Sequence, residues 1–206
     1  MTEAFNFGDG NGPVPAHRHR NPDGTLGGWV ADTAMVDVTA TVGPKAMVFN
    51  FAQVLQEAVI GDAVKVFDEA KIDGHAHIFQ NARVYGNAQV GGNAWVTIGA
   101  HIGGRAIVGE NVQISESAWA GEDAVIQGNA HVRNRAVIKG HARIFGEALI
   151  DGSTVVAGNA RIGGTTELFL DETEPIDEDV EVLSNVAYAL QRLVTKALKL
   201  DAEIGF

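Results

Sequence analysis

The sequence predicts an all-β solenoid, a parallel β-helix whose coils form a triangular prism. Two observations predict this fold. A six-residue repeat runs without interruption from Ala31 to Leu168, and side chains eighteen residues apart match in chemistry. We expect the β-helix to span residues 29–168, after an N-terminal cap or arm of residues 1–28 and before a C-terminal segment of residues 169–206.

The repeat consists of 23 hexads whose phase never slips. The sixth residue of each hexad is Val, Ile or Leu, except for Ala120, and the fourth is Ala in all but four hexads. Because side chains alternate along a strand, both positions can point inward. The Gly, Asn and Asp residues between them favour the positive backbone angles of a corner. Three sides then close a coil of eighteen residues, which gives about seven to eight coils.

Residues eighteen apart should lie above one another, and several such columns combine compatible side chains. Phe49, Phe67 and Tyr85 form an aromatic column. The predicted polar columns contain the amide ladder Asn93, Asn111 and Asn129, the set Arg105, Asp123 and His141, and the pair Arg133 and Asp151. These columns support the eighteen-residue coil independently of the core pattern.

Both ends of the chain lack the six-residue phase, and we expect them to cap the open coils. The tail from residue 169 is acidic, with nine acidic and three basic residues. An amphipathic helix is predicted from Ser184, a suitable N-cap residue. Its apolar face would pack on the last coil or on its copy in another subunit, and contains Val186, Leu190, Leu193, Val194, Ala197 and Leu200.

The composition excludes several classes of function. The chain has no cysteine, which excludes disulfides, thiolate metal sites and a cysteine nucleophile. Its net charge of −11 argues against a nucleic-acid partner, because phosphate binding needs a cationic surface. No signal peptide is expected, because MTEAFNFGDGNG lacks a basic region and an apolar region, and no membrane span is expected, because no apolar run approaches about 18 residues. We expect a cytoplasmic protein, or a virion component if the gene is that of a phage.

A resemblance to a known family is carried by two runs, PVPAHRHRNPDGTLGGWVADTA and NARVYGNAQVGGNA. They resemble the YdcK-type branch of the hexapeptide-repeat, acyltransferase-like superfamily, and similar V-x-G-N-A repeats occur in bacteriophage proteins. The resemblance covers roughly residues 12–168. It implies a left-handed β-helix that assembles as a homotrimer. For an enzyme of this superfamily it also implies a His general base and acyl-CoA bound between subunits.

Two functions therefore remain open for the sequence. The first is a non-enzymatic structural or binding module, a rigid trimeric β-helix such as a capsid decoration or tail-associated phage protein, with no cofactor and with a protein partner bound through the termini. The alternative is an acyltransferase that uses acyl-CoA on a small hydroxyl or amine acceptor. Its candidate bases are His131 and His141, and its candidate ligands for the coenzyme A phosphates are Arg133, Arg135, Lys139 and Arg143. The simpler interpretation of His141 and Arg133 is that they pair with acids in their columns.

The γ-type carbonic anhydrases are a second class of enzymes with this type of fold, and in them three His from two subunits hold a metal. His75, His77 and His101 do not match that pattern, and no metal site is predicted. Outward apolar side chains instead suggest a subunit interface on two faces of the prism. The predicted interface residues are Trp95, Trp119, Ile107, Val125, Val137, Leu149 and Val155, with Val186, Leu190, Leu193 and Val194 of the helix.

Overall fold

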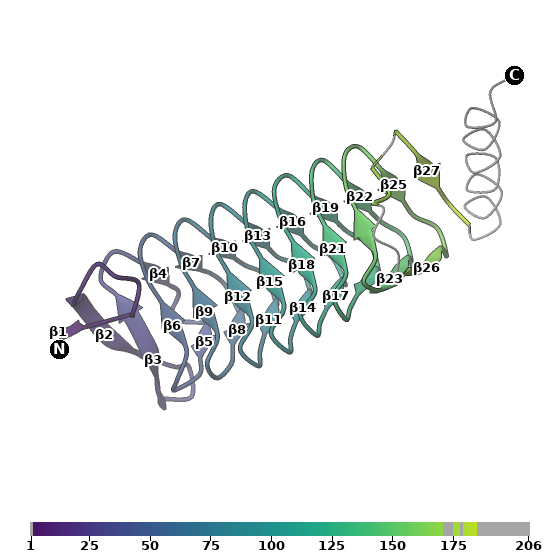
Figure 1. The fold of residues 1–206 in the computed structure, drawn as a ribbon. Helices are drawn as coiled ribbons and strands as arrows, with labels where there is room; N and C mark the ends of the chain where they lie inside the picture. Colours follow the sequence, from purple (N-terminus) through teal and green to yellow (C-terminus); the bar gives the residue numbers. More distant parts are fainter. Residues whose placement is uncertain (1, 171–174, 178, 185–206) are drawn as a thin grey trace, which may run out of the picture.

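The computed structural model describes residues 2–170, 175–177 and 179–184. These residues form a β-solenoid of about eight turns, with three sheets running along a prism (Figure 1). The predicted all-β solenoid is confirmed. Most strands consist of the fifth and sixth residues of one hexad, and each complete coil adds one strand to each sheet.

The three sheets are called A, B and C. Sheet A contains β1 (Glu3–Phe5), β2 (Val14–Arg20), β3 (Leu26–Ala31), β6 (Met47–Val48), β9 (Lys65–Val66), β12 (Arg83–Val84), β15 (His101–Ile102), β18 (Trp119–Ala120), β21 (Val137–Ile138) and β24 (Val155–Val156). Sheet B contains β4 (Met35–Val36), β7 (Gln53–Val54), β10 (Lys71–Ile72), β13 (Gln89–Val90), β16 (Ile107–Val108), β19 (Val125–Ile126), β22 (Arg143–Ile144), β25 (Arg161–Ile162) and β27 (Glu181–Val182). Sheet C contains β5 (Thr41–Val42), β8 (Val59–Ile60), β11 (His77–Ile78), β14 (Trp95–Val96), β17 (Gln113–Ile114), β20 (His131–Val132), β23 (Leu149–Gly152) and β26 (Glu167–Leu170).

Neighbouring strands of the prism are parallel and pair residues eighteen apart. His77 lies opposite Trp95, for example, and Ile78 lies opposite Val96. The eighteen-residue coil is thus confirmed. The final layer departs from this register, because Glu181 of β27 lies opposite Arg161, twenty residues earlier. The hexad phase therefore ends with β26, as the sequence predicts for Leu168.

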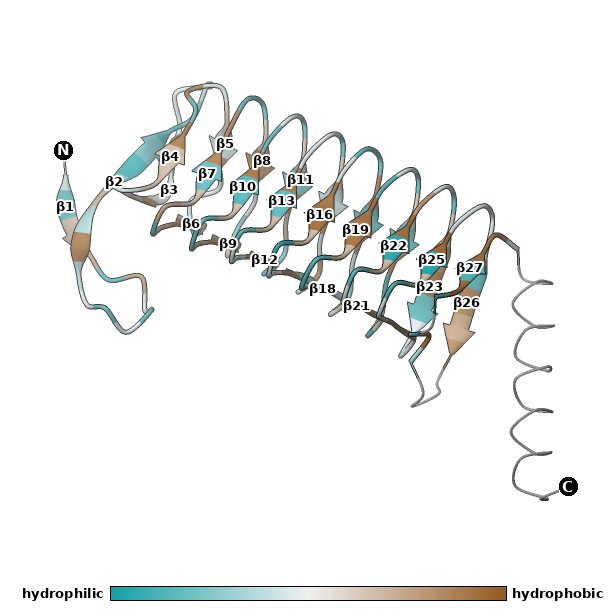
Figure 2. Ribbon diagram, turned by 90° about the horizontal axis from the view of Figure 1, so that it is seen from above, coloured by the Kyte–Doolittle hydropathy of each residue, from teal (hydrophilic) through white to brown (hydrophobic). Residues whose placement is uncertain are grey.

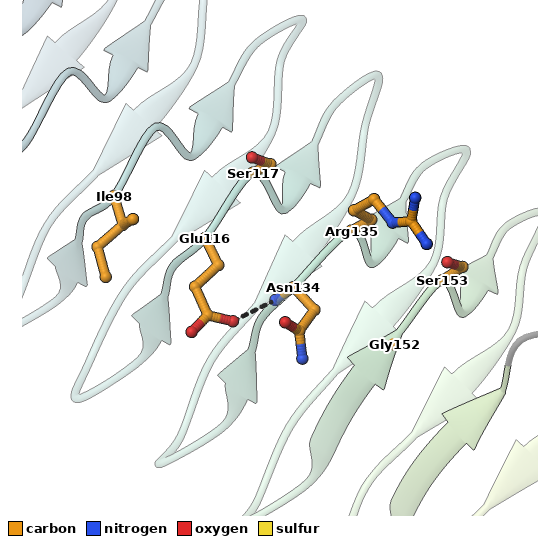
Figure 3. A pocket seen from close by; sticks show the side chains of 7 residues that line it. All are labelled: Ile98, Glu116, Ser117, Asn134, Arg135, Gly152 and Ser153. Carbon is orange, nitrogen blue, oxygen red and sulfur yellow. Dashed lines mark hydrogen bonds between the residues drawn. The ribbon is translucent and has the colours of Figure 1, made fainter.

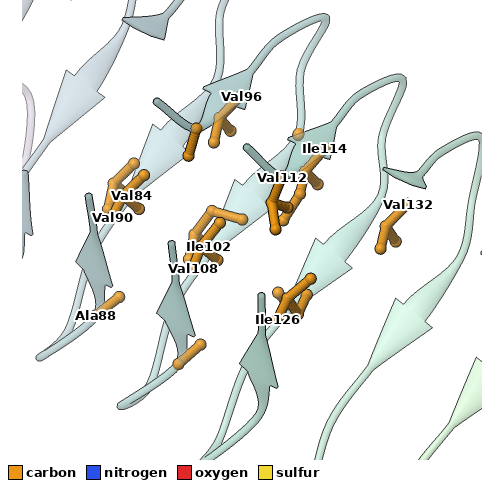
Figure 4. Close-up of a cluster of buried hydrophobic side chains, with 14 of the residues drawn as sticks. Val84, Ala88, Val90, Val96, Ile102, Val108, Val112, Ile114, Ile126 and Val132 are labelled. Atoms are coloured by element: carbon orange, nitrogen blue, oxygen red, sulfur yellow. The ribbon is translucent and has the colours of Figure 1, made fainter. Parts of the chain in front are cut away.

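The main core is a column of side chains along the prism axis, and a smaller cluster of Phe7, Ala16, Ala31 and Phe49 lies at the N-terminal end. From Ala40 to Leu168, the fourth and sixth residues of the hexads are at most 1% exposed, including the exception Ala120. Figure 4 shows how aliphatic side chains from the three sheets meet in the middle of the coil. Burying a Val, Ile or Leu side chain stabilises the fold by roughly 1.5–3 kcal/mol. The six-residue repeat thus supplies the main stabilising term in every coil.

The N-terminal end of the prism is closed by polar side chains from the antiparallel strand β2 and the turn after it. β5 is the first strand of sheet C, so its backbone groups have no preceding strand to bond. The Asn21 amide replaces that strand, because its Oδ1 accepts from Val42 N at 2.9 Å and its Nδ2 donates to Val42 O at 3.3 Å. His19 Nε2 donates to Ala40 O at 3.0 Å. Both side chains are buried, at 6% and 8% exposure for His19 and Asn21.

The predicted C-terminal helix, with Val186, Leu190, Leu193 and Val194, lies outside the described residues. Across residues 2–170, 175–177 and 179–184 the structure contains strands and turns and no helix. No helix long and apolar enough to cross a membrane occurs in these same ranges.

Candidate interaction surface

The outward side chains of the strands distinguish the three sheets. On sheet B, four of the nine outward residues are charged, and three of them take part in two ion pairs at the surface. Lys71 Nζ lies 2.9 Å from Asp73 Oδ2, and Arg161 Nε lies 3.1 Å from Glu181 Oε1. Most of sheet B therefore has the character of a solvent-facing surface.

The predicted interface residues lie on all three sheets, whereas the sequence indicated two faces. Trp119, Val137 and Val155 belong to sheet A, and Trp95 and Leu149 belong to sheet C. Ile107 and Val125 lie next to each other on sheet B, where Figure 2 shows β16 and β19 brown between more hydrophilic strands. Trp95 and Ile107 are exposed, and the other five are half-buried. Sheet A thus has the most apolar outward residues, and the outward tryptophans occur on sheets A and C but not on sheet B.

Sheet C carries an aromatic patch formed by Val59, His77, Phe79 and Trp95. The His77 ring stacks on the Trp95 ring with centroids 4.6 Å apart, and Phe79 lies 5.8 Å from His77 and 5.9 Å from Trp95. Trp95 remains 48% exposed. The Nδ1 atom of His77 is buried without a hydrogen-bond partner. Stacked rings of this kind form a rigid apolar platform.

A depression of about 450 Å³ adjoins this aromatic patch. Its wall includes the Phe79 ring, which lies directly over Gly61, since a Cβ atom on Gly61 would be only 2.1 Å from the ring. A glycine is required there because any side chain would displace Phe79. The depression is lined by Thr41, Gly43, Val59, Ile60, Gly61, Asp62, Phe79 and Gln80.

Sheet A carries a second aromatic column, and its predicted members are confirmed. Phe49 stacks on Phe67 at 5.1 Å between ring centroids, and Phe67 stacks on Tyr85 at 5.3 Å. Trp119 folds back over Gly121 and donates from Nε1 to the Tyr85 hydroxyl at 3.1 Å. This contact explains why Trp119 is half-buried while Trp95 is exposed.

The candidate catalytic residues lie at different places around the prism. His131 is an exposed outward residue of β20 on sheet C. His141 lies at the corner between sheets A and B, where its Nδ1 is 3.8 Å from Asp123 Oδ2. Asp123 also binds Arg105 through contacts of 2.5 and 2.7 Å, and this hydrogen bonding lowers the pKa of the Asp123 carboxyl. The predicted column of Arg105, Asp123 and His141 is therefore confirmed.

The four basic residues considered for coenzyme A are also dispersed. Arg133 donates from Nε to Asp151 Oδ2 at 2.6 Å, which confirms that predicted pair. Burial raises the pKa of Asp151, but hydrogen bonds from Asn134, Gly152 and Arg133 outweigh it, and the pKa is lowered overall. Arg135 lies at the corner between sheets C and A, Lys139 directly follows β21, and Arg143 points outward from sheet B. One chain does not assemble these residues into a site.

The remaining histidines have local partners. His75 Nε2 lies 3.2 Å from Glu57 Oε2, and His17 Nδ1 lies 2.8 Å from Asp32 Oδ1. His101 packs its ring edge against Tyr85, and burial followed by the charge of Arg83 lowers its pKa. In the part of the chain that the structure describes, no three His, Asp or Glu side chains are grouped so that they could hold a metal ion.

Several of these residues have no signal in the sequence repeat. The capping pair His19 and Asn21 precedes the hexads, and Phe79 occupies a hexad position that is filled by many residue types. Only the glycine at Gly61, eighteen residues before Phe79, could have indicated a ring lying across the neighbouring coil. A comparison of the sequence with protein-family models and with curated proteins finds no match in either case.

Proposed function

We propose that this chain is a non-enzymatic structural module that assembles as a parallel homotrimer through sheets A and C. The observation that carries the proposal is the distribution of outward residues. The outward tryptophans Trp29, Trp119 and Trp95 lie on sheets A and C, whereas sheet B has no outward aromatic residue and carries four charged ones, three of them in ion pairs. In a cyclic trimer, sheet C of one copy packs against sheet A of the next, so one corner of each prism faces the three-fold axis.

The occupant of the aromatic patch would then be sheet A of a second copy. Exposed aromatic side chains such as Trp95 are typical of buried interface centres. At the height of the patch, sheet A of a parallel copy offers Lys65, Arg83 and His101, while Trp119, Val137 and Val155 lie further along the same face. The arginine guanidinium can also stack on an aromatic ring.

The mass of the assembly in solution tests this proposal. We expect light scattering after size-exclusion chromatography to give three times the 21.7-kDa chain mass. Trp95→Glu should dissociate the trimer, because it places a charge in the interface. Gln89→Glu is the matched control on sheet B and should leave the trimer intact. A monomeric wild-type protein, or a Trp95→Glu variant that remains trimeric, would overturn the proposed arrangement.

An acyltransferase is the second candidate, and one observation favours it. His131 is exposed on sheet C, and Arg135 lies at the adjoining corner, so both would border the proposed subunit contact. Acetyl-CoA should then raise the melting temperature of the trimer, and His131→Ala should abolish acetyl transfer. The structural module predicts no stabilisation by acetyl-CoA and no transfer.

We also propose that the coil is left-handed and that the chain is related to YdcK-like proteins and to bacteriophage proteins with similar repeats. They are supported by the runs PVPAHRHRNPDGTLGGWVADTA and NARVYGNAQVGGNA and by the unbroken hexads. A loop-free prism suits a virion component, since it offers few sites for local opening. A crystal structure would determine the handedness, and mass spectrometry of purified virions would test a phage location.

A further inference from the structure

The corners of the prism carry a regular ladder of backbone hydrogen bonds. At two of the three corners, the N–H of the third hexad residue donates to the carbonyl of the second residue in the next coil. His75 N donates to Gly92 O at 2.8 Å between sheets B and C, and Asp123 N donates to Gly140 O at 3.0 Å between sheets A and B. All these bonds point from the N-terminal to the C-terminal end.

The corner between sheets C and A changes direction halfway along the prism. Ser117 N donates backward to Ile98 O at 3.2 Å, in the direction opposite to the other corners. One coil later, Arg135 N donates forward to Gly152 O at 2.9 Å. The backbone angles change at the same place, since Glu116 and Ser117 both have positive φ, at 65° and 71°. The ladder therefore reverses between the coil of Ser117 and the coil of Arg135.

This reversal turns two carbonyl groups toward each other. The C=O and N–H of a trans peptide point in opposite directions. Because the N–H of Ser117 points backward, the C=O of Glu116 points forward to the next coil. Because the N–H of Arg135 points forward, the C=O of Asn134 points back toward Glu116. Neither oxygen accepts a hydrogen bond from the described residues.

Two carbonyl oxygens in this arrangement repel each other unless something positive lies between them. At a strand spacing of about 4.8 Å, two C=O bonds of about 1.2 Å aimed straight at one another would bring their oxygens within about 2.4 Å. The two groups therefore diverge from that line, at a corner where Glu116 and Asn134 are both exposed. There the surface is hollowed, with a volume of about 400 Å³. The hollow is lined by Ile98, Glu116, Ser117, Asn134, Arg135, Gly152 and Ser153.

A carboxylate completes this group of oxygen atoms. The Glu116 side chain reaches across to the next coil, and one oxygen, Oε2, accepts from Asn134 N at 3.1 Å (Figure 3). The Ser117 and Ser153 side chains lie at the rim of the same hollow. The hollow thus presents two backbone carbonyls, a carboxylate and hydroxyls as oxygen donors, while the Arg135 guanidinium, which also lines it, is directed toward Ser153 and away from Glu116 (Figure 3).

We propose that this corner binds a Ca²⁺ ion through the carbonyl oxygens of Glu116 and Asn134 and the Glu116 carboxylate, with water completing its coordination. Ca²⁺ accepts six to eight oxygen ligands in flexible geometry at roughly 2.3–2.6 Å. Mg²⁺ requires a tighter octahedron at roughly 2.0–2.1 Å, which a shallow, open corner does not enforce. The ligands all come from one chain, although this corner between sheets C and A would face the three-fold axis of the proposed trimer.

Calorimetric titration of the EDTA-treated full-length protein with CaCl₂ tests the site. The decisive variant is Glu116→Gln, and the matched control is Glu122→Gln. Glu122 Oε2 accepts from Gly140 N at 2.9 Å in the same manner, but at a corner whose ladder does not reverse. The two substitutions therefore remove the same charge from equivalent hydrogen bonds.

We expect the wild-type protein and Glu122→Gln to bind one Ca²⁺ per chain and Glu116→Gln to bind it more than about tenfold less tightly. The melting temperatures of the three proteins in EDTA should be similar, which separates loss of binding from loss of folding. MgCl₂ and KCl should not compete at equal concentration. The proposal is overturned if Ca²⁺ does not bind, if both variants lose it equally, or if Mg²⁺ binds as tightly.

Discussion

Each two-residue strand has one inward and one outward side chain, here called its inward and outward halves. Along the prism, these two halves differ in how much their residue types vary. In β17, Ile114 is fully buried in the core while its neighbour Gln113 is exposed. The inward half repeats almost the same residue types in every coil. The outward half changes from Thr41 at the start of sheet C to Trp95 in the middle and Glu167 at the end.

The difference shows that stability and function are carried by separate surfaces of the same strands. Every coil buries nearly the same apolar set, so each coil contributes through contacts with its two neighbours. The outward residues make few of these contacts and are free to vary. Aromatic, acidic and basic outward residues can thus define an interface or a binding site without altering the core.

The largest effect on stability is expected from a substitution of an inward side chain. Ile114→Ala should lower the free energy of unfolding by about 2–5 kcal/mol, because it removes buried methyl groups and leaves a cavity. Gln113→Ala, in the same strand, should change it by less than about 0.5 kcal/mol. Urea unfolding followed by circular dichroism measures both. Equal losses in the two variants would show that inward and outward halves do not differ as described.

A smaller effect is expected where an outward ring rests on the backbone. A Cβ atom on Gly121 would lie 2.2 Å from the Trp119 ring, whereas a Cβ on Gly109 would meet nothing within 4 Å. Gly121→Ala should therefore cost about 1–3 kcal/mol and shift the Trp119 fluorescence to longer wavelength. Gly109→Ala should be neutral or stabilising by roughly 0.4–1 kcal/mol, since alanine restricts the unfolded chain. If Gly121→Ala leaves both stability and fluorescence unchanged, the ring does not occupy this position.

The inward half is the part of the fold that could be predicted from the sequence. The hexads predicted the buried positions, the eighteen-residue coil and the three parallel sheets, because inward packing depends only on size, apolarity and period. The columns at eighteen likewise predicted the Asn93–Asn111–Asn129 ladder, whose bonds are 3.0 Å long. Chemistry within one column is visible in a sequence once the period is known.

The outward surface could be predicted only in part, because it depends on contacts between columns. Trp119 reaches Tyr85, which directly follows strand β12 of the same sheet but lies 34 positions away, and no repeat predicts that hydrogen bond. The reversed peptide at Glu116 leaves no composition signal, since Glu110 and Glu122 occupy the same hexad position with an ordinary ladder. His19 and Asn21 cap the prism from a segment that has no repeat at all.

A substitution in the asparagine ladder should lower the stability by less than Gly121→Ala does. Asn111 donates to Asn129 and accepts from Asn93 at the exposed corner between sheets B and C. Asn111→Ala removes both bonds and should cost about 1 kcal/mol, since an exposed group regains bonds to water. Asn159→Ala is the control, because the structure shows no side-chain hydrogen bond for this residue in the described chain. Thermal unfolding by calorimetry measures the difference, and a loss for Asn159→Ala as large as that for Asn111→Ala would contradict the ladder's role.

The smallest effect on stability is expected from a change of pH. It concerns His19 at the capped N-terminal end and not the repeating coils. Burial lowers the pKa of His19 below its ordinary value of 6.5, despite the opposing hydrogen bond to Ala40, and the charge of His17 lowers it further. The unfolded chain therefore binds a proton more readily than the folded one between these two pKa values. The His19 contribution to stability is complete above pH 6.5 and is lost as the pH falls from 6.5 through the lower folded pKa. The melting temperature of the wild-type protein should drop more steeply than that of His19→Gln between pH 7 and pH 5, because glutamine keeps a donor for Ala40 but does not titrate. Parallel profiles for the two proteins would show that protonation of His19 does not open the cap.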